Sequence, residues 1–312
     1  MRAIAISAFG ADPELIEVPE PEPRPGEILV RLRAAGYNPV DTKIAGGAMK
    51  GVMSPAFPLI MGQDGAGVVT AVGGEVSRFR PGDEVYGRFS HPARGLGSYA
   101  EYAVAAEDGP VARMPKGMTP EQAAAVPTAT GTAWDVVEAA RIDEGQTVLI
   151  VGATGGVGQS AIQLAALRGA RVIATAAPAD EDLVRGFGAA ETVDRDRAAE
   201  QVRAAHPDGI DAVLELVSPA GATGPAEALL RPGGVICSIV HALDPDALAA
   251  RELRGVNVIN HPTPQVLTNL ADLIDAGRLR VRVEAQVPLE RAPAELREIA
   301  GRRARGKTVF LL

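Results

Sequence analysis

A glycine-rich turn between residues 147 and 160 has the residue types and spacing of a phosphate-binding site. A short apolar run ends in Gly152, and Gly155 and Gly158 follow at intervals of three residues. Glycines in such a turn let the backbone approach a pyrophosphate closely, and a helix that begins there directs N–H groups and the positive end of its dipole at the anion. The G-x-x-G-x-x-G spacing differs from the commoner G-x-G-x-x-G, so the turn alone predicts a phosphate site without identifying the ligand.

The chain around this turn alternates short apolar strands with helical segments. Thr119-Pro120-Glu121-Gln122 combines an N-cap residue, a proline at the first helical position and an acid in the first turn, which predicts a helix start. Alternation of this kind is typical of a doubly wound parallel sheet, and we predict a dinucleotide-binding domain over residues 119–260. Its predicted helices are 132–140, 180–186, 196–205 and 222–230, and its strands after the turn are 171–175, 191–193, 210–217, 234–240 and 255–260.

Residues 1–118 show a different sequence pattern. Short apolar or alternating runs are separated by turns rich in Pro and Gly, such as residues 19–26 and 80–83, which predicts a small β-barrel. After residue 260 we predict a helix at 265–276, a strand at 282–287, a helix at 292–301 and a closing strand at 308–312. Because the last strand has no obvious place in the parallel sheet, residues 261–312 are expected to return to the N-terminal domain.

The composition is that of an ordinary globular protein and argues against several classes of function. The formal net charge is −8, and basic and acidic residues are interspersed without a basic stripe, so nucleic-acid binding is not expected. The single cysteine, Cys237, excludes an intramolecular disulfide framework and a Cys-rich metal site. The N-terminus does not resemble a signal peptide, and no apolar run approaches the roughly 20 residues that span a bilayer. We therefore expect a cytoplasmic protein without a membrane partner.

Five sequence blocks in order carry a resemblance to a known family. They are Ala35–Lys43, Gly62–Val69, Gly97–Tyr102, the turn Gly152–Gly158 and Arg305–Val309. Together they resemble the medium-chain dehydrogenase/reductase superfamily, and specifically its zinc-free quinone oxidoreductase-like branch, over nearly the whole chain. The resemblance implies an α/β protein with a GroES-like β-barrel catalytic domain and a Rossmann doubly wound parallel-sheet domain. It also implies an active-site cleft between the domains and a homodimer.

Two of these blocks lack the metal ligands that zinc-dependent members of the superfamily carry. No cysteine lies near Asn38, and Gln63 stands where the zinc-binding histidine is expected, so we expect no zinc. Without a Lewis acid, simple alcohol oxidation is disfavoured. Hydride delivery to a quinone or an α,β-unsaturated carbonyl needs only hydrogen-bond donors for the developing enolate. The resemblance thus implies a zinc-independent, NADPH-dependent reductase of small quinones or enones.

By resemblance, Asn38, Asp41 and Lys43 lie in the block that lines the nicotinamide end of the cleft, and they are the predicted catalytic residues. We predict that Asn38 orients the substrate or the nicotinamide ribose and that Lys43 stabilises the substrate oxygen or supplies a proton. Asp41 would hold Lys43 or another group in place. The structural alternatives are turn caps for Asn38 and Asp41 and a solvated lysine for Lys43. Related thioester enoyl reductases often carry a catalytic tyrosine in the loop that follows. Residues 45–56 contain no tyrosine, which argues against an enoyl thioester as substrate and does not identify the proton donor.

The end of the second predicted strand favours NADPH over NADH. A typical NAD site places Asp or Glu about 20 residues beyond the glycines, whereas this strand ends in Thr175 and Ala176 without an acid. A neutral strand end leaves room for the 2′-phosphate of NADPH, which the family mostly uses. The residues directly after it add no basic group, and Arg185 lies a turn into the next helix.

The predicted cofactor contacts combine the turn with positions given by the resemblance. They are Thr132, Gly152, Ala153, Thr154, Gly155, Gly156, Val157, Gly158, Thr175, Ala176, Val217, Ser218, Val240, His241, Arg305 and Lys307. Thr132 could equally cap a helix, and Lys307 could be a solvated lysine at a strand end.

Two alternative functions stay open at this level. A pathway-specific tailoring reductase would use the same cofactor on one polyketide-like or enoyl intermediate and would reduce quinones poorly. A nucleotide-binding protein with little catalysis would bind the cofactor without consuming it. The segments expected to line the cleft, residues 45–59 and 261–265, do not identify the acceptor.

Overall fold

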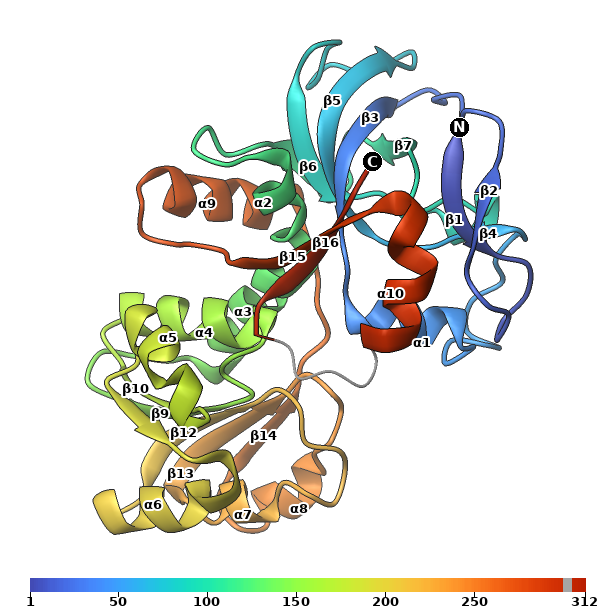
Figure 1. The fold of residues 1–312 in the computed structure, drawn as a ribbon. Coiled ribbons are helices and arrows are strands. Elements are labelled where there is room, and N and C mark those ends of the chain that lie inside the picture. The colour runs from blue at the N-terminus through green and yellow to red at the C-terminus, as the bar shows by residue number, and fades with distance from the viewer. Residues whose placement is uncertain (300–304) are drawn as a thin grey trace. The chain divides into compact units, whose positions relative to one another are not determined.

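The computed structural model describes residues 1–299 and 305–312, which divide into two compact units (Figure 1). Unit 1 comprises Met1–Ala129, Pro262–Gly277 and Val281–Leu312, and unit 2 comprises Thr130–His261 and Arg278–Arg280. Unit 2 begins later than residue 119 because helix α2 (Pro120–Ala124) packs on strands of unit 1. Thr119 caps α2 and accepts the N–H of Gln122, which confirms the predicted helix start.

Unit 1 is built from a seven-stranded sheet and a three-stranded sheet. In the larger sheet the order is β15-β16-β3-β5-β6-β8, and β7 also pairs with β3; the smaller has the order β2-β1-β4. The strands are β1 Arg2–Ile6, β2 Glu14–Glu17, β3 Glu27–Gly36, β4 Leu59–Ile60, β5 Asp64–Val72, β6 Glu84–Arg88, β7 Tyr102–Ala106, β8 Val111–Arg113, β15 Val283–Pro288 and β16 Lys307–Leu311. Besides α2, the α-helices are α1 Pro39–Ala45, α9 Pro264–Asp275 and α10 Ala292–Ile299.

The C-terminal strand β16 lies against the long strand β3. The two pair antiparallel, with Val309 opposite Gly36 and Leu311 opposite Ala34. Beyond the last pair the backbone N–H of Tyr37 still donates to the carbonyl of Thr308 at 3.0 Å. The same register carried one residue further sets Lys307 beside Asn38, immediately before α1.

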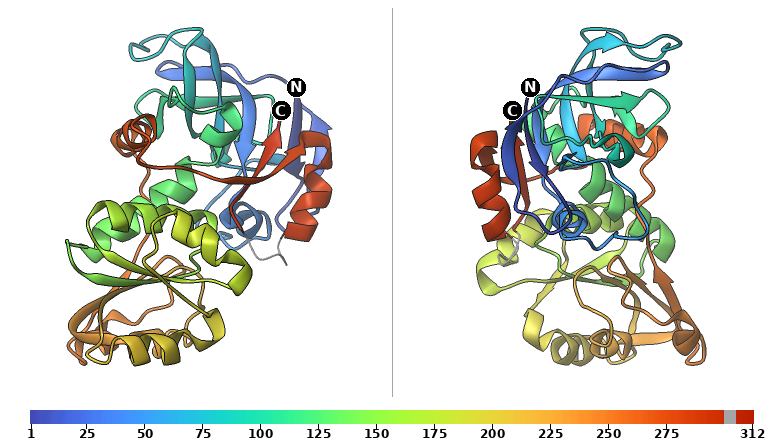
Figure 2. Two further views of the ribbon diagram at one scale, coloured as in Figure 1. Left: turned by 60° about the vertical axis from the view of Figure 1, so that its left-hand side comes forward. Right: turned by 90° about the vertical axis from the view of Figure 1, so that its right-hand side faces the viewer.

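Unit 2 is a parallel six-stranded sheet in the order β11-β10-β9-β12-β13-β14, which confirms the predicted doubly wound fold. Its strands are β9 Thr147–Val151, β10 Arg171–Thr175, β11 Glu191–Val193, β12 Ile210–Glu215, β13 Leu230–Ser238 and β14 Arg254–Asn257. Its α-helices are α3 Pro127–Ala140, whose first turn belongs to unit 1, and α4 Gly156–Leu167, α5 Glu181–Gly186, α6 Ala198–Ala205, α7 Gly224–Glu227 and α8 Pro245–Ala249. Helices α3, α4 and α5 cover one face of the sheet and α6, α7 and α8 the other (Figure 2).

Several predicted elements differ in their bounds. Helix α3 starts at Pro127, so Thr132 lies inside it and the alternative that Thr132 caps a helix is wrong. The helix predicted at 222–230 is shorter in the structure, where α7 covers Gly224–Glu227 and Leu230 already begins β13. Helix α10 ends at Ile299, and the last two positions of the helix predicted at 292–301 lie outside the described residues. Helix α1, which begins directly after Asn38, was not predicted.

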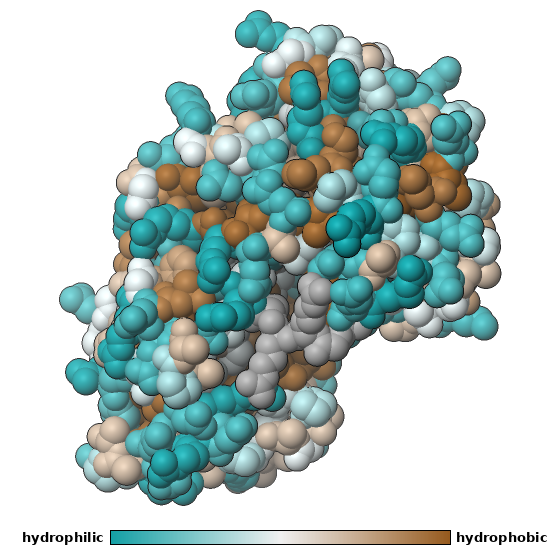
Figure 3. Space-filling model, in the orientation of Figure 1, coloured by the Kyte–Doolittle hydropathy of each residue, from teal (hydrophilic) through white to brown (hydrophobic). Residues whose placement is uncertain are grey.

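Polar side chains cover most of the face drawn in Figure 3, and apolar ones form small separate groups on it. The described part of the chain contains no helix long and apolar enough to cross a membrane.

Candidate functional site

The glycine turn connects β9 to α4, and two of its three spaced glycines are required by the local geometry. Gly152 has φ 86°, a conformation that side-chain-bearing residues rarely adopt, and its N–H donates to Thr175 Oγ1 at 3.1 Å. A Cβ atom on Gly158 would lie 2.3 Å from the carbonyl oxygen of Gly152 and 2.6 Å from the Cα of Ala153. The turn therefore packs against the first turn of α4 with no room for a side chain at either position.

The start of α4 suits an anion. Gly155 occupies the N-cap position without a side-chain cap, and the first turn carries no acidic residue. The first N–H groups of a helix lack intrahelical acceptors and carry the positive end of its dipole. Gln159, which is almost fully buried, donates to the carbonyl of Thr154 at 2.6 Å and holds the loop onto the helix. This cradle fits a pyrophosphate group.

Most of the other predicted cofactor contacts lie at one edge of the parallel sheet. Thr175 ends β10, whereas the pairs Val217–Ser218 and Val240–His241 follow the carboxyl ends of β12 and β13. With β9 between β10 and β12, these strands are consecutive neighbours. The carboxyl edge of such a sheet is where dinucleotides bind in doubly wound folds. Ala153, Gly156, Val157 and Ala176 belong to the same edge, and Arg305 and Lys307 belong to unit 1.

Two residues that the sequence reasoning missed shape this edge. Glu215, at the end of β12 and 1% exposed, accepts the backbone N–H groups of Val217 at 3.1 Å and Ser218 at 2.9 Å. Ser238, at the end of β13, accepts the N–H of Val240 through its hydroxyl oxygen at 3.2 Å. Each is a polar residue that follows at least three consecutive apolar residues and ends its strand, and that signal could have identified both.

In unit 1, Asn38 is the centre of a buried polar network. Its backbone N–H donates to Asp41 Oδ2 at 2.9 Å, and its side-chain Nδ2 donates to Asp64 Oδ2 at 2.8 Å. Its Oδ1 accepts the ammonium group of Lys307 at 2.6 Å, and the same ammonium donates to the carbonyl of Tyr37. Asn38, Asp41 and Lys307 are at most 5% exposed and Asp64 is fully buried. Buried polar groups need such partners, and here each has at least one.

Asp41 lies at the third position of α1, where it reaches back to the N–H of Asn38. It also accepts the hydroxyl of Tyr99 at 2.7 Å and the amide of Gln63 at 3.3 Å. Gln63 in turn accepts the guanidinium group of Arg88. Asp41 therefore fixes the start of α1 to the segments that contain Gln63 and Tyr99.

Asp64, the first residue of β5, fixes the opposite side of the network. It accepts the backbone N–H of Thr128 at 2.9 Å and the Thr128 hydroxyl at 2.6 Å, in addition to the Asn38 amide. Asp64 lies within the sequence block Gly62–Val69, and the sequence predicts no individual role for this residue. The Asn-Pro-x-Asp spacing at the start of α1 carries the signal of a helix cap, whereas nothing local points to Asp64.

Lys43, by contrast, is exposed on α1, and its side chain makes no hydrogen bond or ion pair with residues 1–299 or 305–312. Asp41 does not hold Lys43, because the Asp41 carboxylate is turned inward to Tyr99 and Gln63. The alternative that Lys307 is a solvated lysine at a strand end is wrong, because Lys307 is buried. The catalytic roles of Asn38, Asp41 and Lys43 stay predictions.

Burial shifts the ionisation of three members of the network. Removal from water raises the pKa of Asp41 from 3.8 to about 6, against the opposing hydrogen bond from Tyr99 and with a further contribution from the nearby Asp64 charge. Burial also raises the pKa of Tyr99 well above its usual range, so its hydroxyl stays a donor. Burial lowers the pKa of Lys307, while the charges of Asp64 and Asp41 oppose the change.

The Asp41 shift predicts a pH dependence of stability. Because its folded pKa of about 6 lies above the unfolded value, the folded protein holds this proton more tightly. Protonation of Asp41 therefore adds to the free energy of unfolding; this contribution is complete below about pH 4 and is lost as the pH rises through 6. Between pH 5 and pH 8 the free energy of unfolding should fall by roughly 1 kcal/mol. Urea unfolding at the two pH values should show this loss in the wild type and a smaller loss in Asp41→Asn. Equal pH slopes for the two proteins would contradict the assignment.

The residues described in the structure contain no group of three or more His, Cys, Asp or Glu side chains arranged to hold a metal ion. Asn38 and Gln63 occupy the two positions at which zinc-dependent members of the superfamily are expected to carry cysteine and histidine ligands. Both side-chain amides are hydrogen-bonded within the network.

Comparison with known proteins extends over both units. Residues 24–116 match the family described as alcohol dehydrogenase GroES-like domain, and residues 187–310 match the family described as zinc-binding dehydrogenase. These matches confirm the predicted combination of domains.

Individual relatives support the same assignment of both domains. The chain is 32% identical to a quinone oxidoreductase of Sus scrofa, over 100% of this chain and 98% of that protein. It is 38% identical to a chloroplastic quinone-oxidoreductase homolog of Spinacia oleracea over 203 residues, which are 62% of this chain and 61% of that one. The solved quinone oxidoreductase from Coxiella burnetii superposes with a TM-score of 0.89 at 29% identity, over 100% of this chain and 99% of that chain.

Proposed function

The chain belongs to the medium-chain dehydrogenase/reductase superfamily, and on that premise we propose that it is a zinc-independent, NADPH-dependent reductase of quinones or α,β-unsaturated carbonyl compounds. The observation that carries the proposal is the turn at Gly152–Gly158, whose close packing leaves a backbone cradle for a pyrophosphate at the start of α4. Quinone oxidoreductases among the relatives support the class of acceptor.

In this proposal the residues of unit 2 hold and orient the cofactor. The N–H groups at the start of α4 bind its phosphates, while Glu215 and Ser238 keep the loops after β12 and β13 in place beside it. NADPH supplies the hydride when bound. The side chain of Val217 lies over Gly152 and is half exposed, which makes it an apolar wall of the same edge.

The residues of unit 1 provide the acceptor side without a metal. A zinc site needs thiolate, imidazole or carboxylate ligands, whereas the matching positions here carry the amides of Asn38 and Gln63. This departure supports zinc independence although one matching family is described as zinc-binding. Lys43, exposed and unpaired within the described residues, can place positive charge near a substrate oxygen that gains electron density.

The preference for NADPH is supported by a basic residue just after β11, the strand next to β10. Thr175 at the end of β10 pairs with Val193 at the end of β11, and Arg195 follows two residues later in a short 3-10 helix. Arg195 is exposed and has no polar partner among the described residues. It can therefore reach a phosphate beside the neutral end of β10.

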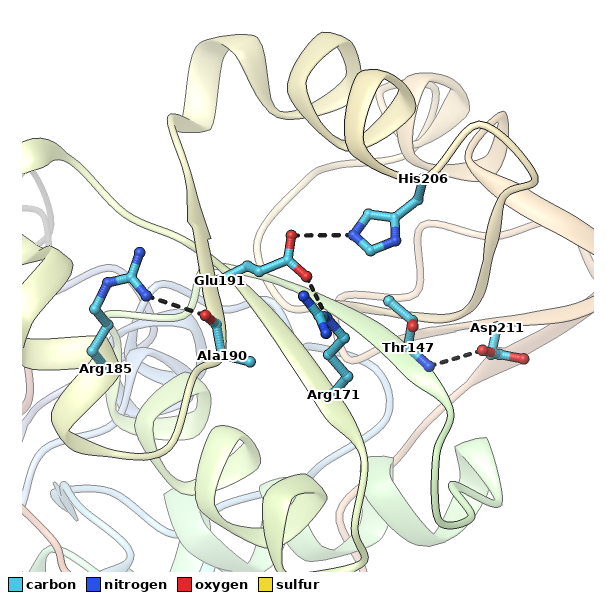
Figure 4. A network of polar contacts seen from close by, with 7 residues as sticks. All are labelled: Thr147, Arg171, Arg185, Ala190, Glu191, His206 and Asp211. Atoms are coloured by element: carbon cyan, nitrogen blue, oxygen red, sulfur yellow. Dashed lines mark hydrogen bonds and ion pairs between the residues drawn. The ribbon is translucent and has the colours of Figure 1, made fainter.

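The other arginines of this region have partners of their own. Arg197 pairs with Glu200 at 2.8 Å. Arg185 donates to the carbonyl of Ala190 at 3.1 Å and to the hydroxyl of Thr192, so it is held against β11 (Figure 4). The same view shows Glu191 between Arg171 and His206. Arg171 and Glu191 are the first residues of β10 and β11, so these contacts lie at the amino ends of the strands and not at the carboxyl edge where the cofactor is proposed to bind.

Replacing Arg195 with glutamate should weaken NADPH binding about tenfold or more and change NADH binding by less than about twofold, because only NADPH carries the 2′-phosphate. Fluorescence titration with each nucleotide measures both constants. Arg203→Glu is the matched control, since Arg203 on α6 is another exposed arginine of unit 2 that has no polar partner among residues 1–299 and 305–312. An equal loss for NADPH and NADH would count against a 2′-phosphate contact.

The proposed reaction is tested by following NADPH oxidation with a panel of quinones and enones. Turnover of several acceptors supports the proposal, and turnover of one enoyl substrate with little quinone activity supports a tailoring reductase instead. Binding of NADPH with a raised melting temperature and no oxidation by any acceptor would leave a nucleotide-binding protein. Light scattering of the same preparation tests the homodimer that the superfamily resemblance implies.

A further inference from the structure

We propose that Lys307 is a positioning residue: its buried ammonium group sets the orientation of the Asn38 amide and balances the carboxylates of Asp41 and Asp64, which together fix the start of α1. The inference rests on the proposed function, because that function places Asn38 and Lys43 on the acceptor side. It differs from the cofactor contact that the sequence predicted for Lys307.

The strand register brings the two residues together. Val309 pairs with Gly36, and Tyr37 still bonds Thr308, so the next step along both strands sets Lys307 beside Asn38. Both residues are buried, and the Lys307 ammonium donates to Asn38 Oδ1 at 2.6 Å. The main-chain pairing of β16 with β3 therefore delivers a cation to the residue that precedes α1.

The contacts allow the Asn38 amide one orientation. Lys307 can only donate, so the atom facing it must be the amide oxygen, and the Asp64 carboxylate faces Nδ2 at 2.8 Å. A flipped amide would set its NH2 group against the ammonium and its oxygen against the carboxylate. Both contacts would then be repulsive in a site with almost no access to water.

Two carboxylates act on the Lys307 ammonium: Asp41 on α1 and Asp64 at the start of β5. Tyr99 donates a hydrogen bond to Asp41, and Arg88 on β6 donates one to Gln63. Removing Lys307 would leave the Asp41 and Asp64 carboxylates without their buried counter-charge. The Asn38 oxygen and the Tyr37 carbonyl would also lose a donor, so the entry to α1 would lose its fixed geometry.

A kinetic comparison separates positioning from cofactor binding. Lys307→Met should lower kcat for acceptor reduction about tenfold or more while the Kd for NADPH changes by less than about twofold, and Lys307→Arg, which keeps the charge, should recover part of kcat. Lys116→Met is the control, since Lys116 is an exposed lysine of the same unit. A folded Lys307→Met protein with wild-type kcat overturns the proposal, and so does a loss confined to NADPH affinity.

A second measurement does not depend on activity. Urea midpoints are compared for Lys307→Met, Asn38→Ala and the double variant. Coupling through the ammonium–amide contact predicts that the double variant loses clearly less than the sum of the single losses. Additive losses overturn the positioning role even in an active enzyme, whereas failure of the wild type to oxidise NADPH overturns only the proposed function. Should Lys307→Met fail to fold, Lys307→Gln, which keeps an amide donor but removes the charge, takes its place in both experiments.

Discussion

Gly158→Ala is expected to destabilise unit 2 and to weaken nucleotide binding, although alanine is the better helix former. Helix propensity alone would make the substitution stabilising by about 1 kcal/mol. The added Cβ would instead lie 2.3 Å from the carbonyl oxygen of Gly152 and 2.6 Å from the Cα of Ala153, both backbone atoms that cannot rotate away. Overpacking of this kind costs about 1–3 kcal/mol, so we expect the steric cost to exceed the gain in helix propensity.

Two measurements check this prediction. Urea unfolding gives the change in stability. Fluorescence titration should show NADPH affinity reduced by about tenfold or more, because the turn must move away from the helix start that we propose as the phosphate site. Gly186→Ala in α5 is the matched control, since a Cβ there would meet nothing within 4 Å. A Gly158→Ala protein as stable as the control variant would contradict the close packing of the turn.

Asp64→Leu should produce the largest loss of stability in unit 1. The side chain is fully buried, and its removal leaves the Asn38 amide and the Thr128 N–H without their acceptor. It also takes one of the two nearby carboxylates, Asp41 and Asp64, away from the Lys307 ammonium. Breaking a buried charge pair by removing one partner costs about 3–5 kcal/mol. The measured quantity is the free energy of unfolding in urea at pH 7.

Two further variants separate hydrogen bonding from charge. Asp64→Asn keeps an acceptor oxygen and should lose less stability than the leucine variant. Adding Lys307→Met to Asp64→Leu removes the stranded ammonium, so the double variant should regain part of the loss. If Asp64→Leu unfolds within about 1 kcal/mol of the wild type, the network does not support the fold as described.

The features that the sequence predicted well are those fixed by short-range spacing. The glycines at 152, 155 and 158, the strand before them and the helix after them lie within one stretch, and the structure places them as a strand, turn and helix. Thr119 and Pro120 define a helix start by local rules of capping and backbone geometry. Local patterns also gave the alternation that builds the parallel sheet, because each segment must bury one face.

The environment of Asn38 was decided by tertiary structure. Its partner Asp64 lies 26 residues away and Lys307 lies 269 residues away, and no local pattern links them. The ring of Tyr99 packs edge-on against Phe310, and its hydroxyl donates to Asp41, which is 58 residues away in the chain. The sequence by itself thus determined the cofactor turn and the fold class, because these follow from periodicity and backbone conformation. Only the pairing of β16 with β3 decided that Lys307 is a buried partner of Asn38, because strand register brings together residues that are distant in the chain.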